Sequence, residues 1–152
     1  YHDYCFFTSQ ETKQVMQTFL PLESFSESAK VLDYKRLGKQ RVEAKQILNA
    51  LREKTGWKNH PATRMWEGYE PGLIFYMNTM IQEWIDRGYN NTMPISWDID
   101  EKIQYPNWFG GEIHTTHRSA LLYKDYEFYS RYAWKESPEL NYFWPEPLCE
   151  QG

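Results

Sequence analysis

Residues 33–54 read DYKRLGKQRVEAKQILNALREK, and this stretch decides the fold. On a helical wheel with about 100° per residue, five apolar residues fall within one arc that suits a core-facing side: Leu37, Ala44, Ile47, Leu48 and Leu51. The pattern predicts a long helix over roughly residues 30–54. Serines at positions 24, 26 and 28 are candidate N-terminal caps for this helix, and Gly56 ends it. Asp33 is a point at which the helix can restart after a short first helix.

The rest of the chain predicts further helices separated by Pro, Gly and Asn. Pro61 begins a short helix to about residue 67, a second helix runs over roughly 71–87, and a last helical region spans about 112–131 with a break near Asp125. Residues 16–21 are expected to be extended, and 89–111 to form a long loop. We therefore expect an all-α fold: a compact single domain over 16–152, preceded by an arm over 1–15, with a long central basic helix, extended loops and no sheet beyond a stray short pair.

Charge is distributed unevenly along the chain. The 152 residues carry a net charge of −4, yet residues 30–64 hold ten basic and three acidic side chains, so this segment carries +7 and the remainder −11. Such an asymmetry indicates a localised anion-binding face on an otherwise acidic molecule, and a solvated helix face is the alternative.

The two cysteines, Cys5 and Cys149, lie near opposite ends of the sequence and form neither a disulfide framework nor a metal-binding spacing. We expect two free thiols in a reducing compartment, and a pairing that ties the ends together is the alternative. The sequence shows no recognisable signal-peptide pattern and no apolar run of membrane-spanning length, so we expect neither a leader nor a membrane span. We expect a cytoplasmic or nucleoid-associated protein without a membrane partner.

Glu43 lies at the rim of the predicted helix, beside Ile47 and one turn from Lys39. A carboxylate between an apolar surface and several cations is a candidate catalytic group, because burial raises its pKa while cations lower it. The alternative is an ordinary ion pair between Lys39 and Glu43.

Two further clusters are candidate phosphate-binding sites. The first is Gly56-Trp57-Lys58-Asn59-His60-Pro61, at a helix N-terminus, where phosphate is favoured; a capped turn with a packed Trp is the alternative. The second is His114-Thr115-Thr116-His117-Arg118-Ser119, where His117, Arg118 and Ser119 can bind phosphate or the His can be packed and hydrogen-bonded. Its two histidines lack further ligands at metal-binding spacing, so we expect no metal.

Several motifs together resemble the pyrimidine-dimer DNA glycosylase (endonuclease V-like) family. They are Leu32-Asp33, Arg41-Val42-Glu43-Ala44, residues 56–61 and Arg87-Gly88-Tyr89. The chain is most similar to a little-characterised bacterial group within that family, whose members begin Met-Gln-Thr-Phe-Leu-Pro, as at residues 16–21. That group also carries His-Arg-Ser, as at 117–119, and Tyr-x-Trp-Pro, as at 142–145.

The resemblance implies an all-helical fold, a nucleotide flipped out of duplex DNA, and attack on the sugar by a chain-terminal α-amine to form a Schiff base. By motif, Glu43 is the glutamate that stabilises the cationic sugar, and Arg41 is the neighbouring arginine. Fifteen residues precede Met16 here. If they are absent from the working protein, Gln17 after methionine removal supplies the amine. If they are retained, water activated by Glu43 is an alternative nucleophile, and Lys35 or Lys39 is another.

We therefore predict a DNA glycosylase, with or without abasic-site lyase activity, that excises a damaged or modified pyrimidine from double-stranded DNA. Its expected catalytic residues are Glu43, Arg41 and Gln17, and no cofactor is expected. The expected DNA-binding residues are Lys35, Arg36, Lys39, Trp57, Lys58, Asn59, His60, Arg64, His117, Arg118 and Ser119. A monomer is expected. The alternative function is a non-catalytic nucleic-acid-binding or structural protein on the same scaffold.

Overall fold

The computed structural model describes residues 16–53, 56, 58–95 and 103–145. Its helices are α2 (Phe25–Val31), α3 (Tyr34–Glu53), α4 (Pro61–Arg64), α5 (Glu70–Asp86), α6 (Glu112–Lys124) and α7 (Tyr126–Tyr129), followed by the 3₁₀ turn η2 (Ser130–Tyr132). No strand occurs in these parts of the chain, so the all-α prediction is confirmed. The cysteines and the predicted N-terminal arm lie outside the described residues.

The helix boundaries follow from local capping. Ser24 caps α2, because its side chain accepts a hydrogen bond from the backbone N–H of Glu27 at 3.1 Å. The Asp33 carboxylate likewise accepts from the N–H of Arg36 at 3.3 Å, so the chain restarts as α3 after the break. Asp125 breaks the last helical region as predicted, and its carboxylate caps α7 through the N–H of Phe128. One prediction was too long: α4 ends at Arg64, three residues before the expected end.

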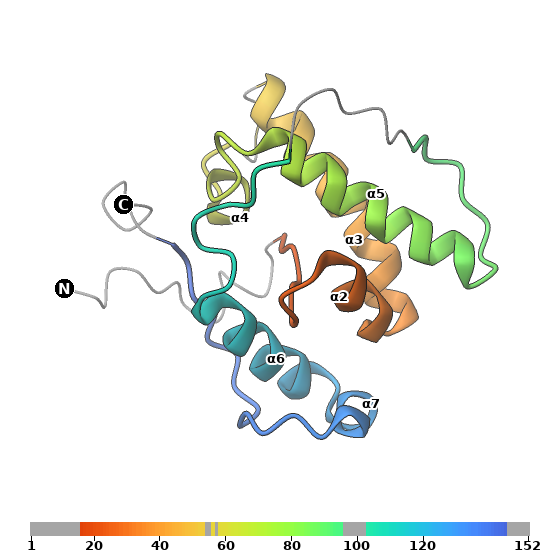
Figure 1. The fold of residues 1–152 in the computed structure, drawn as a ribbon, viewed down its shortest axis with the longest axis vertical. Coiled ribbons are helices and arrows are strands. Elements are labelled where there is room, and N and C mark those ends of the chain that lie inside the picture. The colour runs from red at the N-terminus through yellow and green to blue at the C-terminus, as the bar shows by residue number, and fades with distance from the viewer. Residues whose placement is uncertain (1–15, 54–55, 57, 96–102, 146–152) are drawn as a thin grey trace.

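The two longest helices, α3 and α5, lie side by side, whereas α6 and α7 form the opposite end of the molecule (Figure 1). Helices α3 and α5 are antiparallel, since Arg52 near the end of α3 pairs with Glu70 at the start of α5 at 3.0 Å. Residues 16–21 run between the two groups of helices without forming a helix. This central position makes the segment the scaffold of the site described below.

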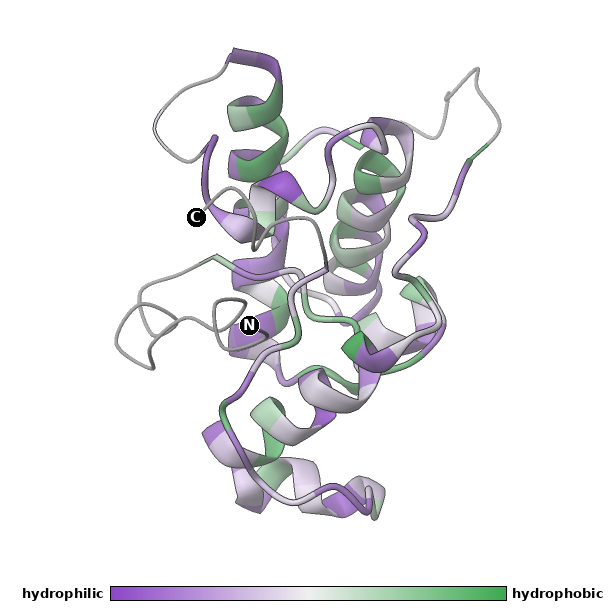
Figure 2. Cartoon of the chain, turned by 90° about the vertical axis from the view of Figure 1, so that its left-hand side faces the viewer, coloured by the Kyte–Doolittle hydropathy of each residue, from purple (hydrophilic) through white to green (hydrophobic). Residues whose placement is uncertain are grey.

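The core is built from the apolar sides of these helices and from aromatic rings. The helices carry hydrophobic residues on some sides and hydrophilic residues on others, as Figure 2 shows. Fully buried side chains include Leu37 and Ile47 of α3, Tyr76 of α5 and Trp66 between α4 and α5. Among the described helices, none combines the length and the apolar character that crossing a membrane requires.

Candidate active site

Residues 16–20 are buried along their whole length, including the polar residues Gln17 and Thr18, which are 3% and 0% exposed. An extended segment inside a helical protein has no neighbouring strand to satisfy its backbone, and unpaired buried N–H and C=O groups are costly. Side chains from α3, α5 and α6 meet this need. The site is therefore organised around the backbone of residues 17–21.

Glu43 of α3 holds the first of these backbone groups. Its Oε1 accepts a hydrogen bond from the backbone N of Gln17 at 3.3 Å and another from Nε2 of Gln40 at 3.2 Å. Its Oε2 lies 3.9 Å from Nζ of Lys39, and 16% of the Glu43 side chain is exposed. The carboxylate thus joins the buried segment on one side and reaches solvent on the other.

Gln40 and Tyr76 fix the geometry around Glu43. Oε1 of Gln40 accepts from the backbone N of Phe19 at 2.8 Å and from the hydroxyl of Tyr76 at 2.6 Å. Because both donors converge on this oxygen, the amide nitrogen must face Glu43. The Tyr76 hydroxyl also lies 2.8 Å from the carbonyl oxygen of Phe19. Gln40 is 1% exposed. The two hydrogen bonds that join Tyr76 to Gln40 and Gln40 to Glu43 are therefore held in place by the surrounding core.

Burial raises the pKa of Glu43 above its ordinary value. Opposing effects, which lower that pKa, come from the N–H of Gln17, the charge of Lys39, the amide of Gln40 and the charge of Lys124, in decreasing order. The 72% exposure of the Lys39 side chain explains why this cation does not overcome burial, because solvent screens an exposed pair. The result is a carboxyl group that binds a proton more readily than an exposed glutamate does.

Two histidines of α6 hold the next backbone groups. Nδ1 of His117 accepts from the N–H of Leu20 at 2.9 Å, and Nδ1 of His114 lies 2.8 Å from the carbonyl oxygen of the same residue. His117 is fully buried, and burial lowers its pKa to about 3. It is therefore a neutral acceptor inside the protein. This placement argues against the predicted phosphate contact and favours the packed, hydrogen-bonded alternative.

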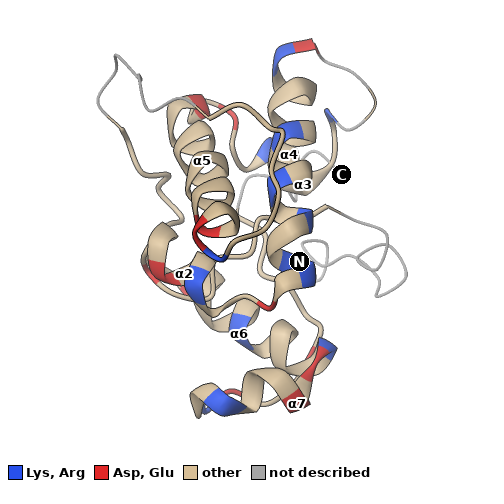
Figure 3. Ribbon diagram, turned by 90° about the vertical axis from the view of Figure 1, so that its right-hand side faces the viewer, with Lys and Arg blue, Asp and Glu red and all other residues tan. Residues whose placement is uncertain are grey.

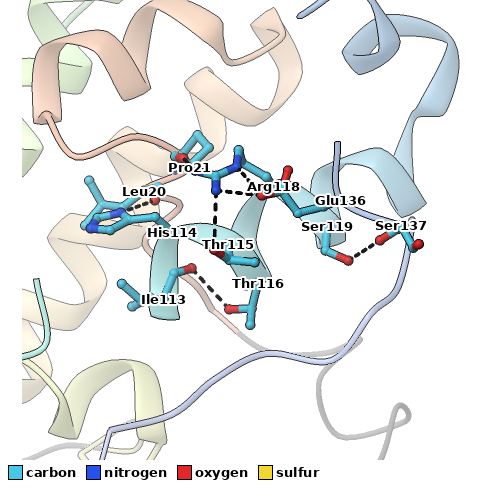
Figure 4. Close-up of polar contacts among 10 residues, drawn as sticks. All are labelled: Leu20, Pro21, Ile113, His114, Thr115, Thr116, Arg118, Ser119, Glu136 and Ser137. Carbon is cyan, nitrogen blue, oxygen red and sulfur yellow. Dashed lines mark hydrogen bonds and ion pairs between the residues drawn. The ribbon is translucent and has the colours of Figure 1, made fainter. Parts of the chain in front are cut away.

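The neighbouring residues of α6 also make internal contacts, as Figure 4 shows. The Arg118 guanidinium donates to the carbonyl oxygen of Pro21 at 2.8 Å and pairs with Glu136 at 2.6 Å. The Ser119 hydroxyl donates to the carbonyl oxygen of Ser137. The His-Arg-Ser motif thus ties residues 20–21 and the segment after η2 to α6. These internal contacts of the Arg118 guanidinium argue against the phosphate-binding role that the sequence suggested.

The basic residues of α3 divide into exposed and engaged groups. Lys and Arg recur along α3, whereas Asp and Glu seen in the same view lie mainly on other helices (Figure 3). Lys35 and Lys39 are exposed. Arg36 is half-buried and pairs with Asp33 at 3.2 Å. Lys35 and Lys39 are consequently the better-placed cations for an external phosphate.

Arg41 lies near the opposite edge of α3 from Glu43. Its guanidinium lies over the ring of Trp84, 4.2 Å from the ring centroid, and donates to Oδ1 of Asn91 at 2.7 Å. The described contacts of Arg41 and Glu43 share no partner, and none of them joins the two predicted catalytic residues directly. Arg41 instead connects α3 to the loop after α5.

The second predicted cluster is only partly described, since Trp57 lies outside the described residues. Lys58 and Asn59 are exposed and Arg64 is half-buried. His60 caps α4, because its Nδ1 accepts from the N–H of Ala62 at 2.9 Å, and burial lowers its pKa to about 4. The His60 ring lies 6.2 Å from that of Trp144, which in turn packs on Tyr142. The Tyr142 ring also packs edge-on against the ring of Phe19, so a chain of rings connects α4 to the buried segment.

Sequence reasoning missed Gln40, Tyr76 and Lys124. A buried glutamine on the apolar side of a predicted helix was the one available signal for Gln40, because such an amide needs buried partners. Tyr76 carries no sequence signal beyond its place within the predicted helix over 71–87, and Lys124 is remote from α3 in sequence. No group of three or more metal-ligating side chains is found in the described parts of the chain.

Comparison with known proteins gives one positive finding. A family model described as pyrimidine dimer DNA glycosylase matches residues 16–96. The matched region contains the buried segment, Glu43, Gln40 and Tyr76. Neither the curated proteins nor the solved structures provide a significant match.

Proposed function

The chain belongs to the pyrimidine dimer DNA glycosylase family, a family of DNA repair enzymes, and we propose that it excises a damaged or modified pyrimidine from duplex DNA with Glu43 as its central acidic group. We further propose that it falls within the bacterial group whose members begin Met-Gln-Thr-Phe-Leu-Pro. The observation that supports the proposal best is the position of Glu43: partly buried, hydrogen-bonded and open to solvent on one side.

This position suits the chemistry of base removal. Breaking an N-glycosidic bond builds positive charge on the sugar, and a fixed negative group nearby lowers that barrier. The hydrogen bonds from Gln17 and Gln40 hold Oε1, so the carboxylate does not need to reorient as the charge develops. Such groups supply roughly 10²–10⁴-fold in rate.

The nucleophile can be an amine or water, and the structure gives a reason to test both. The backbone nitrogen of Gln17 lies 3.3 Å from Oε1 of Glu43, so an α-amine at this position would lie next to the Glu43 carboxylate. An α-amine has a pKa of about 8 and is partly uncharged at neutral pH. In the printed sequence this nitrogen belongs to a peptide bond, whose delocalised lone pair is not nucleophilic. Water activated by Glu43 is the route that needs no free amine, and it gives base release without strand cleavage.

The first experiment measures base release from duplexes that each contain one damaged pyrimidine, including a cyclobutane dimer and an oxidised pyrimidine. The unsubstituted protein is compared with Glu43→Gln and with Glu53→Gln, which changes an exposed acid on the same helix. We expect release by the unsubstituted protein and by Glu53→Gln, and release slowed by roughly 10²–10⁴-fold in Glu43→Gln. Absence of release from every duplex would favour a DNA-binding protein without chemistry.

The second experiment separates the two nucleophiles. Chains that begin at residue 1, 16 or 17 are incubated with an abasic-site duplex and borohydride, which traps a Schiff base covalently. Mass spectrometry first verifies that the N-terminal Gln17 has kept its amine and has not cyclised. Trapping that depends on a start at residue 17 supports the amine route. Base release without trapping by any of the three chains supports the water route.

A further inference from the structure

Three aromatic residues form a cluster beside Glu43 that the proposed chemistry does not use. We call Tyr34, Trp84 and Tyr89 the aromatic patch. Their rings follow one another: the centroids of Tyr34 and Tyr89 are 5.9 Å apart, and those of Tyr89 and Trp84 are 4.5 Å apart. Tyr34 and Tyr89 are 53% and 40% exposed. Tyr34 begins α3, the helix that carries Glu43, whereas Trp84 lies on α5 and Tyr89 just after it. Exposed aromatic rings that meet between these two helices, close to a candidate catalytic group, require an explanation.

The aromatic patch is held rigidly by its surroundings. Trp84 packs against α3 where Gly38 has no side chain, and a Cβ added at Gly38 would lie 2.9 Å from Cζ3 of Trp84. The indole N–H donates to the carbonyl oxygen of Asn90 at 2.7 Å, which fixes the backbone next to Tyr89. Glycine in the interior of a helix costs about 0.5–1 kcal/mol relative to alanine. Glycine at position 38 therefore lowers the intrinsic stability of α3 but leaves the space that the Trp84 ring occupies.

Two motifs of the sequence also serve the aromatic patch. Gly88 has a φ of +92°, a conformation that favours glycine, and it turns the chain after α5 so that Tyr89 is exposed. Arg41 covers Trp84 and binds Asn91, so it supports the loop from the other side. The Arg87-Gly88-Tyr89 motif and Arg41 thus act on the same feature of the structure. Together they fix the loop after α5 in the position that leaves the Tyr89 ring exposed.

A groove of about 610 Å³ connects the aromatic patch to Glu43. Tyr34 and Trp84 line it together with Val42, Glu43 and the exposed Lys35 and Lys39. Apolar and aromatic surface, two cations and a candidate catalytic carboxylate therefore share one groove. An unpaired nucleotide of DNA matches this combination. Its flat base can stack on aromatic side chains, and the backbone phosphates on either side of it are attracted to lysines.

We propose that the aromatic patch is a stacking site for an unpaired nucleobase of DNA, with Tyr34 and Tyr89 in contact with the base and Lys35 and Lys39 near its phosphates. This inference rests on the proposed function, because a glycosylase has to unstack a nucleotide before its chemistry can begin. Arg41 and the ring of Tyr89 already contact Trp84, so Trp84 supports the patch and the two tyrosines supply the stacking surface.

The experiment measures binding alone. The probe is a duplex with a single unpaired 2-aminopurine, compared with the same duplex in which this base is paired, and all proteins carry Glu43→Gln so that no excision occurs. The variants are Tyr34→Ala, Tyr89→Ala and the pair together. The matched control is Tyr126→Ala, which removes a tyrosine of α7 that is 60% exposed. Tyr34→Phe and Tyr89→Phe retain the rings and should retain binding.

We expect the preference for the unpaired probe to fall roughly 5- to 150-fold in the alanine variants, the range that corresponds to the loss of one stacked base. The affinity for the paired duplex should change only a few-fold, and the control should match the parent. Equal preference in parent and alanine variants would overturn the inference. Because the assay needs no chemistry, a protein that releases no base can still support the stacking site, and an active enzyme can still refute it.

Discussion

His117 tests whether the His-Arg-Ser motif supports the buried segment. Burial, with a smaller contribution from the charge of His114, lowers the pKa of His117 to about 3, whereas a histidine in an unfolded chain has a pKa of about 6.5. Between these two values the unfolded chain binds a proton that the folded protein excludes. Folding stability is therefore fully present above the unfolded pKa and falls as the pH decreases toward 3.

The size of the effect follows from these two pKa values. From pH 7 to pH 4, His117 alone is expected to reduce the free energy of unfolding by on the order of 3 kcal/mol. Other groups titrate over the same range, so the effect is measured as a difference between two proteins. His117→Asn is a suitable reference, because the amide oxygen can accept from the N–H of Leu20 in place of Nδ1 but does not titrate.

The assay is urea unfolding, followed by tryptophan fluorescence, of the unsubstituted protein and His117→Asn at pH 7 and pH 4. The variant can be less stable at both pH values, but it should lose about 3 kcal/mol less between them. An equal loss in the two proteins would show that the imidazole is not buried and neutral. The phosphate-binding interpretation of His117 would then regain support.

Three further outcomes are expected from changes on α3. Gln40→Met removes a donor that lowers the pKa of Glu43, so that pKa should rise and the acid limb of the rate–pH profile for base release should move to higher pH; an unchanged profile would mean that Gln40 serves packing alone. Lys39→Gln removes an exposed cation and should reduce the slope of log affinity against log salt by about 0.9, as measured by fluorescence anisotropy; an unaltered slope would place the phosphates elsewhere. Gly38→Ala should displace Trp84, because the new Cβ would lie 2.9 Å from Cζ3, and should change the near-ultraviolet circular dichroism; an identical spectrum would show that the indole adjusts in place.

The helices were predictable from the sequence because their signals are local. The apolar period of α3 and α5, and the breaks at Asp33 and Asp125, depend on residues within a few positions of one another. Boundaries were less certain, as α4 shows, because one helical turn has few residues to carry a pattern. The family resemblance rested on short motifs of the same local kind.

The environment of Glu43 was not predictable, because it depends on contacts between residues far apart in the sequence. Residues 16–21 have no period, and their backbone is satisfied by Gln40, His117 and Arg118, which are 21 to 97 positions away. A histidine and an arginine beside a serine suggest phosphate binding when nothing is known of what covers them. The burial of His117 and the internal contacts of Arg118 and Ser119 follow from the packing of α6 on the central segment and on the segment after η2.

The most direct test of the central claim is the single-turnover rate of base release from a duplex with one damaged pyrimidine, measured alongside duplex affinity for the unsubstituted protein and Glu43→Gln. Glutamine preserves the size of the side chain but not its charge, so the rate should fall by roughly 10²–10⁴-fold while affinity stays within a few-fold. Equal rates would contradict the account, because Glu43 would then serve only to anchor Gln17 and to pair with Lys39.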